Sequence, residues 1–281
     1  MWVNLEDPGR ASTDVSAVIT TTAPVIVERA MYLDTGGPFF GAGHESAGVT
    51  NTSTRWTLAE GATGPFFDLF VLLANPSPTP ANVQATYLRP DGSTLVKTYT
   101  VDGNSRRTIW VDYEDATLAD PAVATTLEAT NGVPFLVERA LWWANSFSTW
   151  YEAHNSAGAT ETGPVWALAE GERGGSRGVE TYILVANTSP FEVSADVTLY
   201  LEDGTSLTQT FDIPANARFN VAPGTPGVFE SVANARFGAI VRGNAPIGEE
   251  AQLVVERAMY WNALGTTWAA GTNALGTLVP Q

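Results

Sequence analysis

The chain contains no cysteine, so disulfide bonds and thiolate metal sites are excluded. Lysine is almost absent, and the formal net charge of −16 disfavours nucleic acid and anionic membranes as partners. No apolar stretch is long enough to span a bilayer, and Met1–Arg10 is polar and acidic, unlike a signal peptide. We therefore expect no nucleic-acid partner and no membrane insertion. Because the chain begins inside a repeat, we expect it to be a processed product.

The residues that are present favour a folded, β-rich protein. Hydrophobic residues make up 44% of the 281 positions and aromatic residues 10%, which supports real cores and argues against disorder. Threonine, valine, alanine, glycine and proline are abundant, as is typical of strands joined by turns. The length suits two to three domains of ordinary size.

One strand motif occurs three times, as APVIVERAMYL (23–33), VPFLVERALWW (133–143) and AQLVVERAMYW (251–261). Its glutamates lie at positions 28, 138 and 256, so the steps are 138 − 28 = 110 and 256 − 138 = 118 residues. A period of this length corresponds to a whole domain and not to one rung of a solenoid.

Other motifs recur in step with this strand. Trp56 and Trp166 lie 110 residues apart, and the turn signals at Asp91 and Asp203 lie 112 apart. The change from 110 to 112 places a two-residue insertion in GERGGSRG (171–178), a loop that lacks the ending of a phosphate-binding motif. A further insertion lies near 248–252. Insertions confined to loops indicate two copies of one fold.

Each copy contains about seven short strands and no convincing helix, which predicts tandem immunoglobulin-like β-sandwiches. We assign residues 51–160 to the first repeat and 161–281 to the second repeat. Residues 1–50, with strands expected at 14–20 and in the motif itself, form a half-unit that matches the closing part of a repeat. Because an isolated strand pair is unstable in water, the half-unit should pack on its neighbour or pair with another chain.

The repeated strand carries adjacent glutamate and arginine residues that point to opposite faces. Both faces are otherwise apolar, so each charge needs a partner. We predict structural charge pairs, with Glu60 and Glu170 as partners of the arginines and Arg106 and Arg218 as partners of the glutamates. The motif charges concerned are Glu28, Arg29, Glu138, Arg139, Glu256 and Arg257. The alternative, an acid–base catalytic role for one of the three glutamates, is less favoured because structural ion pairs are common.

A second repeated element combines histidine and serine. His44 and His154 lie 110 residues apart, each two residues before a serine, Ser46 or Ser156. A nucleophile–base pair would need a converging carboxylate and an oxyanion hole. The motif is duplicated, and Thr272 replaces the histidine in the third copy. We therefore predict structural loop histidines, no catalytic residues and no enzyme activity.

Acidic and aromatic residues offer two binding alternatives. Asp112, Glu114 and Asp115 could hold Ca²⁺, but the second repeat has lost these acids and no EF-hand-like pattern occurs, so we expect no metal or other cofactor. Sugar binding needs exposed, flat aromatics. Most tryptophans recur with the repeat and are expected in cores. Phe66 and Phe67 occur in one repeat only and are the expected ligand contacts.

The set W-x-L-A-E-G, L-L-A-N-P, N-S-R, V-E-R-A-M-Y-W and G-x-H-x-S-A-G resembles an uncharacterised tandem repeat family of large secreted or cell-surface bacterial proteins. The resemblance covers essentially the whole chain and implies an extracellular location, but it supplies no catalytic residues.

We therefore expect a non-catalytic structural or adhesive segment. Its partners would be further copies of itself or another surface protein, joined head to tail in a filament or surface layer. A carbohydrate-binding module that binds polysaccharide is the alternative.

Overall fold

The computed structural model describes residues 2–10, 12–34, 41–144 and 150–280. The chain is all-β, with 55% of residues in strands and 5% in helices. The described helices are single turns, at α1 (Val3–Glu6), η1 (Pro8–Arg10), η2 (Val111–Tyr113) and η3 (Ala116–Leu118). No helix in the described part of the chain is long and apolar enough to cross a membrane.

The first repeat contains two antiparallel four-stranded sheets, whose strands pair only with one another. One sheet has the order β3 (Arg55–Leu58), β8 (Ala124–Ala129), β5 (Ala81–Leu88) and β6 (Thr94–Val101). The other has the order β10 (Glu152–Ala157), β9 (Leu136–Trp143), β4 (Phe67–Asn75) and β7 (Ser105–Trp110). Buried positions alternate along β4 and β5, as expected for strands with one face toward a core.

The second repeat has the same plan with additions. One sheet has the order β15 (Ser206–Ile213), β14 (Val193–Leu201), β17 (Ala235–Asn244), β11 (Val165–Leu168) and β20 (Thr277–Leu278), with β12 (Glu172–Arg173) paired to β17. The other has the order β16 (Ala217–Val221), β13 (Glu180–Asn187), β18 (Leu253–Ala263) and β19 (Thr266–Leu275). The described residues thus form eight strands in the first repeat and ten in the second, more than the seven expected. The two-residue strands β12 and β20 account for the two strands by which the second repeat exceeds the first.

The half-unit differs from the expectation. It forms one hairpin, β1 (Glu28–Leu33) and β2 (Ala42–Ala47), and residues 14–20 form no strand. In the first repeat the corresponding strand, β8, lies between β3 and β5. The half-unit has no counterparts of β3 and β5, so residues 14–20 have no strand to pair with.

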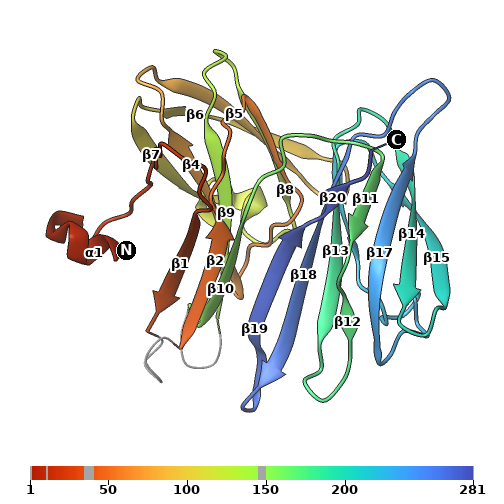
Figure 1. Cartoon of the computed structure of the whole chain (residues 1–281). Helices are drawn as coiled ribbons and strands as arrows, with labels where there is room; N and C mark the ends of the chain where they lie inside the picture. Colours follow the sequence, from red (N-terminus) through yellow and green to blue (C-terminus); the bar gives the residue numbers. More distant parts are fainter. Residues whose placement is uncertain (1, 11, 35–40, 145–149, 281) are drawn as a thin grey trace.

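The four larger sheets together have a propeller-like arrangement of four blades. Strand β10 of the first repeat contacts both β2 of the half-unit and β19 of the second repeat (Figure 1). Strands β2 and β10 carry the G-x-H-x-S-A-G motif, and β19 carries its counterpart, so the three copies lie one after another. This succession brings the repeated strand motif of each unit close to that of the next.

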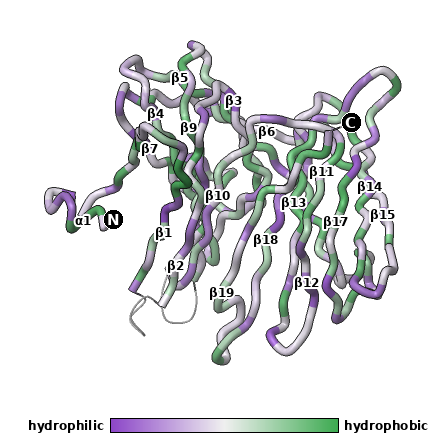
Figure 2. The backbone as a smooth tube through the Cα atoms, viewed as in Figure 1, coloured by the Kyte–Doolittle hydropathy of each residue, from purple (hydrophilic) through white to green (hydrophobic). Residues whose placement is uncertain are grey.

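The apolar core consists of one large cluster for each repeat and a smaller cluster between them. One cluster joins the two sheets of the first repeat, through residues such as Leu58, Val83 and Val137. A second cluster fills the second repeat and includes Ala59 and Ala124 of the first repeat. A third, smaller cluster of Trp143, Leu184, Ala258 and Tyr260 lies between the repeats. Figure 2 shows hydrophobic and hydrophilic segments alternating along the strands of both repeats.

Candidate functional site

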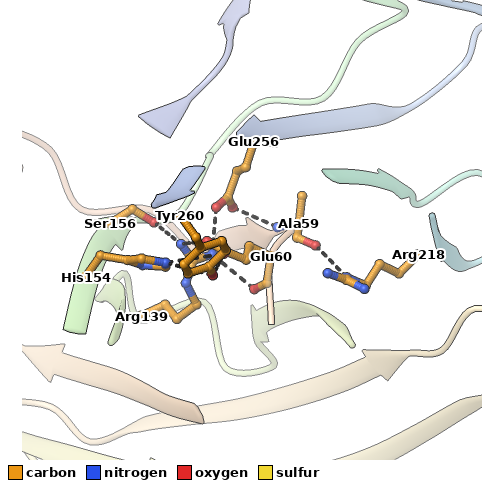
Figure 3. Close-up of polar contacts among 8 residues, drawn as sticks. All are labelled: Ala59, Glu60, Arg139, His154, Ser156, Arg218, Glu256 and Tyr260. Atoms are coloured by element: carbon orange, nitrogen blue, oxygen red, sulfur yellow. Dashed lines mark hydrogen bonds and ion pairs between the residues drawn. The ribbon is translucent and has the colours of Figure 1, made fainter. Parts of the chain in front are cut away.

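A buried polar cluster lies between the two repeats and centres on Arg139 of β9. Its guanidinium is fully buried and forms ion pairs of 2.6 Å with Glu60 and 2.6 Å with Glu256 of β18. It also donates to the hydroxyl of Ser156 at 2.9 Å and to the carbonyl of Glu60 at 3.0 Å (Figure 3). One arginine therefore holds a carboxylate from its own repeat and one from the following repeat.

A second arginine completes the charge balance. Arg218 is buried and donates from Nε to the carbonyl of Ala59 at 3.3 Å, while the Ala59 amide donates to Glu256 at 2.8 Å. Burial raises the pKa of both Glu60 and Glu256, and the nearby Arg139 opposes that rise. Burial lowers the pKa of Arg218 to about 10. Two carboxylates and two guanidiniums thus neutralise one another in a site closed to water.

Histidine and tyrosine occupy the side of this cluster next to Glu60. His154 Nε2 lies 3.2 Å from the Tyr260 hydroxyl, which donates to Glu60 at 3.3 Å. Burial, together with the charge of Arg139, holds the pKa of His154 well below its ordinary value. The histidine is therefore neutral near pH 7, and it positions the tyrosine of the following repeat.

The same contact occurs between the half-unit and the first repeat. Arg29 pairs with Glu138 at 2.7 Å and donates to Ser46 at 3.2 Å. The ring of His44 lies edge-on to Trp142, with centroids 6.0 Å apart. We name Arg, Ser and His of one unit the arginine set, and Glu and the aromatic four residues later in the next unit the glutamate set. The first junction joins the half-unit to the first repeat, and the second junction joins the two repeats.

The structure contains some of the predicted charge pairs and gives other partners to the remaining residues. The structure brings Arg139 together with Glu60 and Arg257 together with Glu170. Arg106 and Arg218 form no ion pair with a motif glutamate among the described residues. Arg106 pairs with Asp14 at 2.6 Å, and Arg218 contacts a carbonyl.

The reason for this difference is the face on which the motif glutamates lie. They point toward the preceding unit and meet its motif arginine, as Glu138 meets Arg29 and Glu256 meets Arg139. Glu28 is exposed. Sequence reasoning sought partners within each repeat and missed this pairing between units. The motif places opposite charges on opposite faces of its strand, but it does not signal this pairing, because the packing of whole units decides which faces meet.

The second copy of the histidine–serine motif is enclosed, whereas His44 and Ser46 of the first copy are half-buried. His154 and Ser156 are 3% and 9% exposed, and their polar atoms contact Tyr260 and Arg139, respectively. A substrate would have to separate the two repeats to reach them. The arrangement can hold two sheets in register.

The two phenylalanines expected to bind a ligand lie at the second junction. Phe66 and Phe67 are mutually edge-on at 4.8 Å, and Phe66 lies 5.6 Å from Trp268 of the second repeat. Phe67 also contacts Trp143 and Tyr260, at 6.3 and 6.0 Å between ring centroids. The structure therefore places these rings in packing between repeats.

The three acids considered for calcium each have a protein partner. Asp112 accepts from the amides of Gly64 and Leu69, at 3.1 and 2.9 Å. Glu114 accepts from Tyr99 at 2.8 Å, and Asp115 accepts from the backbone of residue 117 at 2.9 Å. Within the described residues no group of three or more His, Asp or Glu side chains gathers as a metal site.

Comparisons with known proteins add little to this picture. No family model matches the chain, and no curated protein matches it. The crystal structure of Thermotoga maritima 1070 is 13% identical and has a TM-score of 0.34, covering 42% of this chain and 96% of that one. A structure of infectious bursal disease virus, strain Gx, is 9% identical with a TM-score of 0.18, covering 95% and 76%. Scores this low support no argument about fold or function.

Proposed function

We propose that this chain is a non-catalytic structural segment, in which repeat units stack through one recurring contact to form a rigid array. The observation that supports this most directly is the repetition of the contact, with Arg29 against Glu138 and Arg139 against Glu256. Removing one partner of a buried ion pair typically costs about 3–5 kcal/mol, because the other charge remains buried. Such a contact permits one register between neighbouring units and opposes bending between them.

Each repeat, in this proposal, is a variant of the immunoglobulin-like sandwich. In the first repeat two antiparallel sheets share one core, and the Asp91–Gly92 turn joins β5 to β6 with Gly92 at φ 79°. Glycine adopts this left-handed conformation at low cost. The half-unit contributes only the closing hairpin of such a sandwich.

The location we propose is outside a bacterial cell, as part of a secreted or surface protein. The support is the motif resemblance, together with the net charge of −16. Antibody labelling of intact cells of the source organism tests this location. Labelling only after the cells are broken would contradict it.

Single-molecule extension of the whole chain tests the array. We expect the two repeats to resist separation in the wild type and to separate at much lower force in Arg139→Met. Arg55→Met, at an exposed position of β3, is the matched control and should leave the force unchanged. Repeats that separate at the same force in wild type and Arg139→Met would overturn the proposal.

A second candidate, carbohydrate binding, is favoured by one observation on the first repeat. Trp110 and Trp150 both donate their indole N–H to Asp68, at 3.1 and 2.6 Å, and Tyr113 stands edge-on to Trp110 with 76% of its surface exposed. Retardation on polysaccharide affinity gels that is lost in Tyr113→Ala, but kept in the control Tyr200→Ala, would support this candidate.

The structural role is the better supported of the two. Trp268 is the counterpart of Trp150 in the second repeat; it stacks on Tyr260 with ring centroids 4.7 Å apart, and both rings lie 6.0 Å from Phe67 of the first repeat. At the second junction, this aromatic position is therefore used in the contact between repeats.

A further inference from the structure

An asparagine on one edge strand of each repeat contacts the preceding unit. Strands β2, β10 and β19 are edge strands of three different sheets, and β10 contacts both β2 and β19. Among the described residues no backbone ladder joins β10 to either of them. Asn155 lies between His154 and Ser156 on β10, and Asn273 holds the same position on β19. We name Asn155 and Asn273 the junction asparagines.

The alternation of side chains along a strand explains why this position meets the preceding unit. Residues two positions apart share a face of a strand, and the residue between them points to the opposite face. His154 and Ser156 share the face toward the second repeat, where His154 contacts Tyr260. Asn155 therefore points the other way, toward the half-unit, so that β10 presents polar groups to both of its neighbours.

At the first junction Asn155 contacts four groups of the half-unit. Its amide nitrogen donates to the carbonyl of Glu45 at 3.0 Å and to Nδ1 of His44 at 2.7 Å. Its amide oxygen accepts from Ser46 at 3.2 Å and from Arg29. The opposite orientation of the amide would set its nitrogen against the guanidinium and its oxygen against the carbonyl, so that donor faces donor and acceptor faces acceptor. One side chain thus contacts the whole arginine set of the half-unit.

The second junction repeats this arrangement with the next asparagine. The amide nitrogen of Asn273 donates to the carbonyl of Asn155 at 3.0 Å. Its amide oxygen accepts from Ser156 at 3.2 Å and from Arg139, and Ser156 in turn accepts from Arg139 at 2.9 Å. Three contacts therefore recur at both junctions, to the arginine, to the serine and to the main-chain carbonyl at the position before that serine.

These contacts depend on the register between units. Edge strands that share no ladder can slide past one another by two residues and keep the same side chains on each face. Such a slip would leave the amide, the arginine and the serine without their partners in a buried place, which is unfavourable. The asparagine therefore fits in one register, and only beside a unit that carries arginine and serine in these positions.

We propose that the junction asparagines determine specificity, because each recognises the arginine, the serine and the intervening main chain of the unit before it. The ion pair between arginine and glutamate supplies strength, and the asparagine discriminates between a preceding unit that carries the serine and one that lacks it. The inference rests on the proposed structural function, since it assigns a role within the contact that joins the units.

The tautomer of His44 reports the first of these contacts. Because Nδ1 of His44 accepts from Asn155, the proton of the neutral ring must lie on Nε2. The chain has only two histidines, so ¹⁵N NMR of labelled imidazoles can observe each of them. We expect the Nε2–H tautomer in the wild type and the Nδ1–H tautomer in Asn155→Asp, whose carboxylate can only accept.

The same variant should also change the titration of this ring. The pKa of His44 should rise in Asn155→Asp, because a new negative charge lies beside the imidazole, in addition to the charges of Arg29 and Glu138 that already act on it. Asn220→Asp, at an exposed position of β16, is the matched control and should leave both the tautomer and the pKa unchanged.

A double-mutant cycle across the second junction measures the discrimination itself. Asn273→Ala and Ser156→Ala are made singly and together in the full chain, and urea denaturation gives the unfolding equilibrium constant of each. Loss of the serine should change this constant at least about fivefold more when Asn273 is present than when it is alanine. The control cycle replaces Ser156→Ala by Thr98→Ala, at an exposed position of β6, and should be additive.

Either of two results would overturn the inference. One is a neutral His44 in the wild type that carries its proton on Nδ1, or the same tautomer in the wild type and in folded Asn155→Asp. The other is additive losses in the cycle of Asn273 and Ser156. If far-UV circular dichroism shows that Asn155→Asp is not folded, the wild-type tautomer and the cycle still decide.

Failure of this inference is distinguishable from failure of the proposed function. The extension experiment on Arg139→Met tests whether the units form a rigid array. Additive losses in the cycle, together with a lowered separation force in Arg139→Met, would leave the array standing and remove the role of the asparagines. An unchanged force in Arg139→Met would reject the array itself.

Discussion

The two junctions use equivalent residues but differ in how far they exclude water. At the second junction the side chains of Arg139 and Glu256 are both 0% exposed, whereas Arg29 and Glu138 at the first junction are 40% and 22% exposed. The half-unit has no counterpart of the segment that contains Glu60 in the first repeat. The same ion pair is therefore a sealed internal contact in one place and a partly solvated one in the other, and we expect the sealed pair to contribute more to stability.

The largest expected effect comes from breaking the sealed pair. Arg139→Met leaves Glu60 and Glu256 buried without their shared cation, so we expect the free energy of unfolding to fall by about 3–5 kcal/mol. Urea denaturation followed by tryptophan fluorescence measures the change. Arg55→Met is the control, and a loss below about 1 kcal/mol in Arg139→Met would contradict the assignment of this pair as sealed.

The pKa values of the two histidines offer a second way to compare how far the two junctions exclude water. Burial, then the charge of Arg139, lowers the pKa of His154 well below 6.5, and burial, then Arg29, lowers that of the less enclosed His44. NMR of the two imidazole resonances should show His44 titrating below pH 6.5 and His154 at still lower pH. A His154 midpoint at or above that of His44 would contradict the enclosure.

The same depressed pKa values link stability to pH. The unfolded chain takes up protons below pH 6.5 while the folded histidines do not, so their contribution is present above that pH and is lost as the pH falls. Each histidine can contribute a slope of up to about 1.4 kcal/mol per pH unit. Comparison of wild type with His154→Asn by urea denaturation isolates the larger share, and identical slopes in the two proteins would argue against it.

Breaking the solvated pair should cost much less. For Arg29→Met we expect a loss of about 0–1 kcal/mol in the free energy of unfolding, because a partly exposed ion pair competes with water. Urea denaturation of Arg29→Met beside Arg139→Met makes the comparison direct. Equal losses in the two variants would mean that enclosure does not set the strength of the contact.

The smallest loss of stability is expected at the exposed ion pair of Glu170 and Arg257 in the second repeat. Glu170, paired with Arg257 but 67% exposed, should tolerate Glu170→Gln with a loss below about 0.5 kcal/mol, whereas Glu60→Gln at the buried counterpart should cost more. Thermal unfolding of both variants checks this ranking. A Glu170→Gln loss as large as that of Glu60→Gln would contradict it.

Much of the architecture could be predicted from the sequence because the spacing of the recurring motifs gives the length of each repeat. The all-β class, the hairpin turn at Asp91–Gly92 and the partners of Arg139 and Arg257 within their repeats all follow from local pattern and matched spacing. The prediction of a strand at residues 14–20 was wrong. A strand needs neighbouring strands to pair with, and the half-unit supplies none for these residues.

The pairing between units was beyond that reasoning. Which face of β9 meets β1, and which face meets β18, depends on how whole sheets pack, and no local spacing encodes it. For the same reason Phe66 and Phe67, unique to one repeat, were expected at a ligand surface, whereas the structure places them against Trp268 of the next repeat.

Neighbouring units meet through one arginine set and one glutamate set. Whole repeats could therefore be added or removed during evolution without changing the residues that meet at each junction. Deleting residues 51–160 as a block would bring Arg29 and His44 opposite Glu256 and Tyr260, which are the partners that their counterparts Arg139 and His154 already have. Duplicating that block would likewise leave no orphaned charge. Recombination can therefore lengthen or shorten such a protein by whole repeats while every interface stays chemically matched.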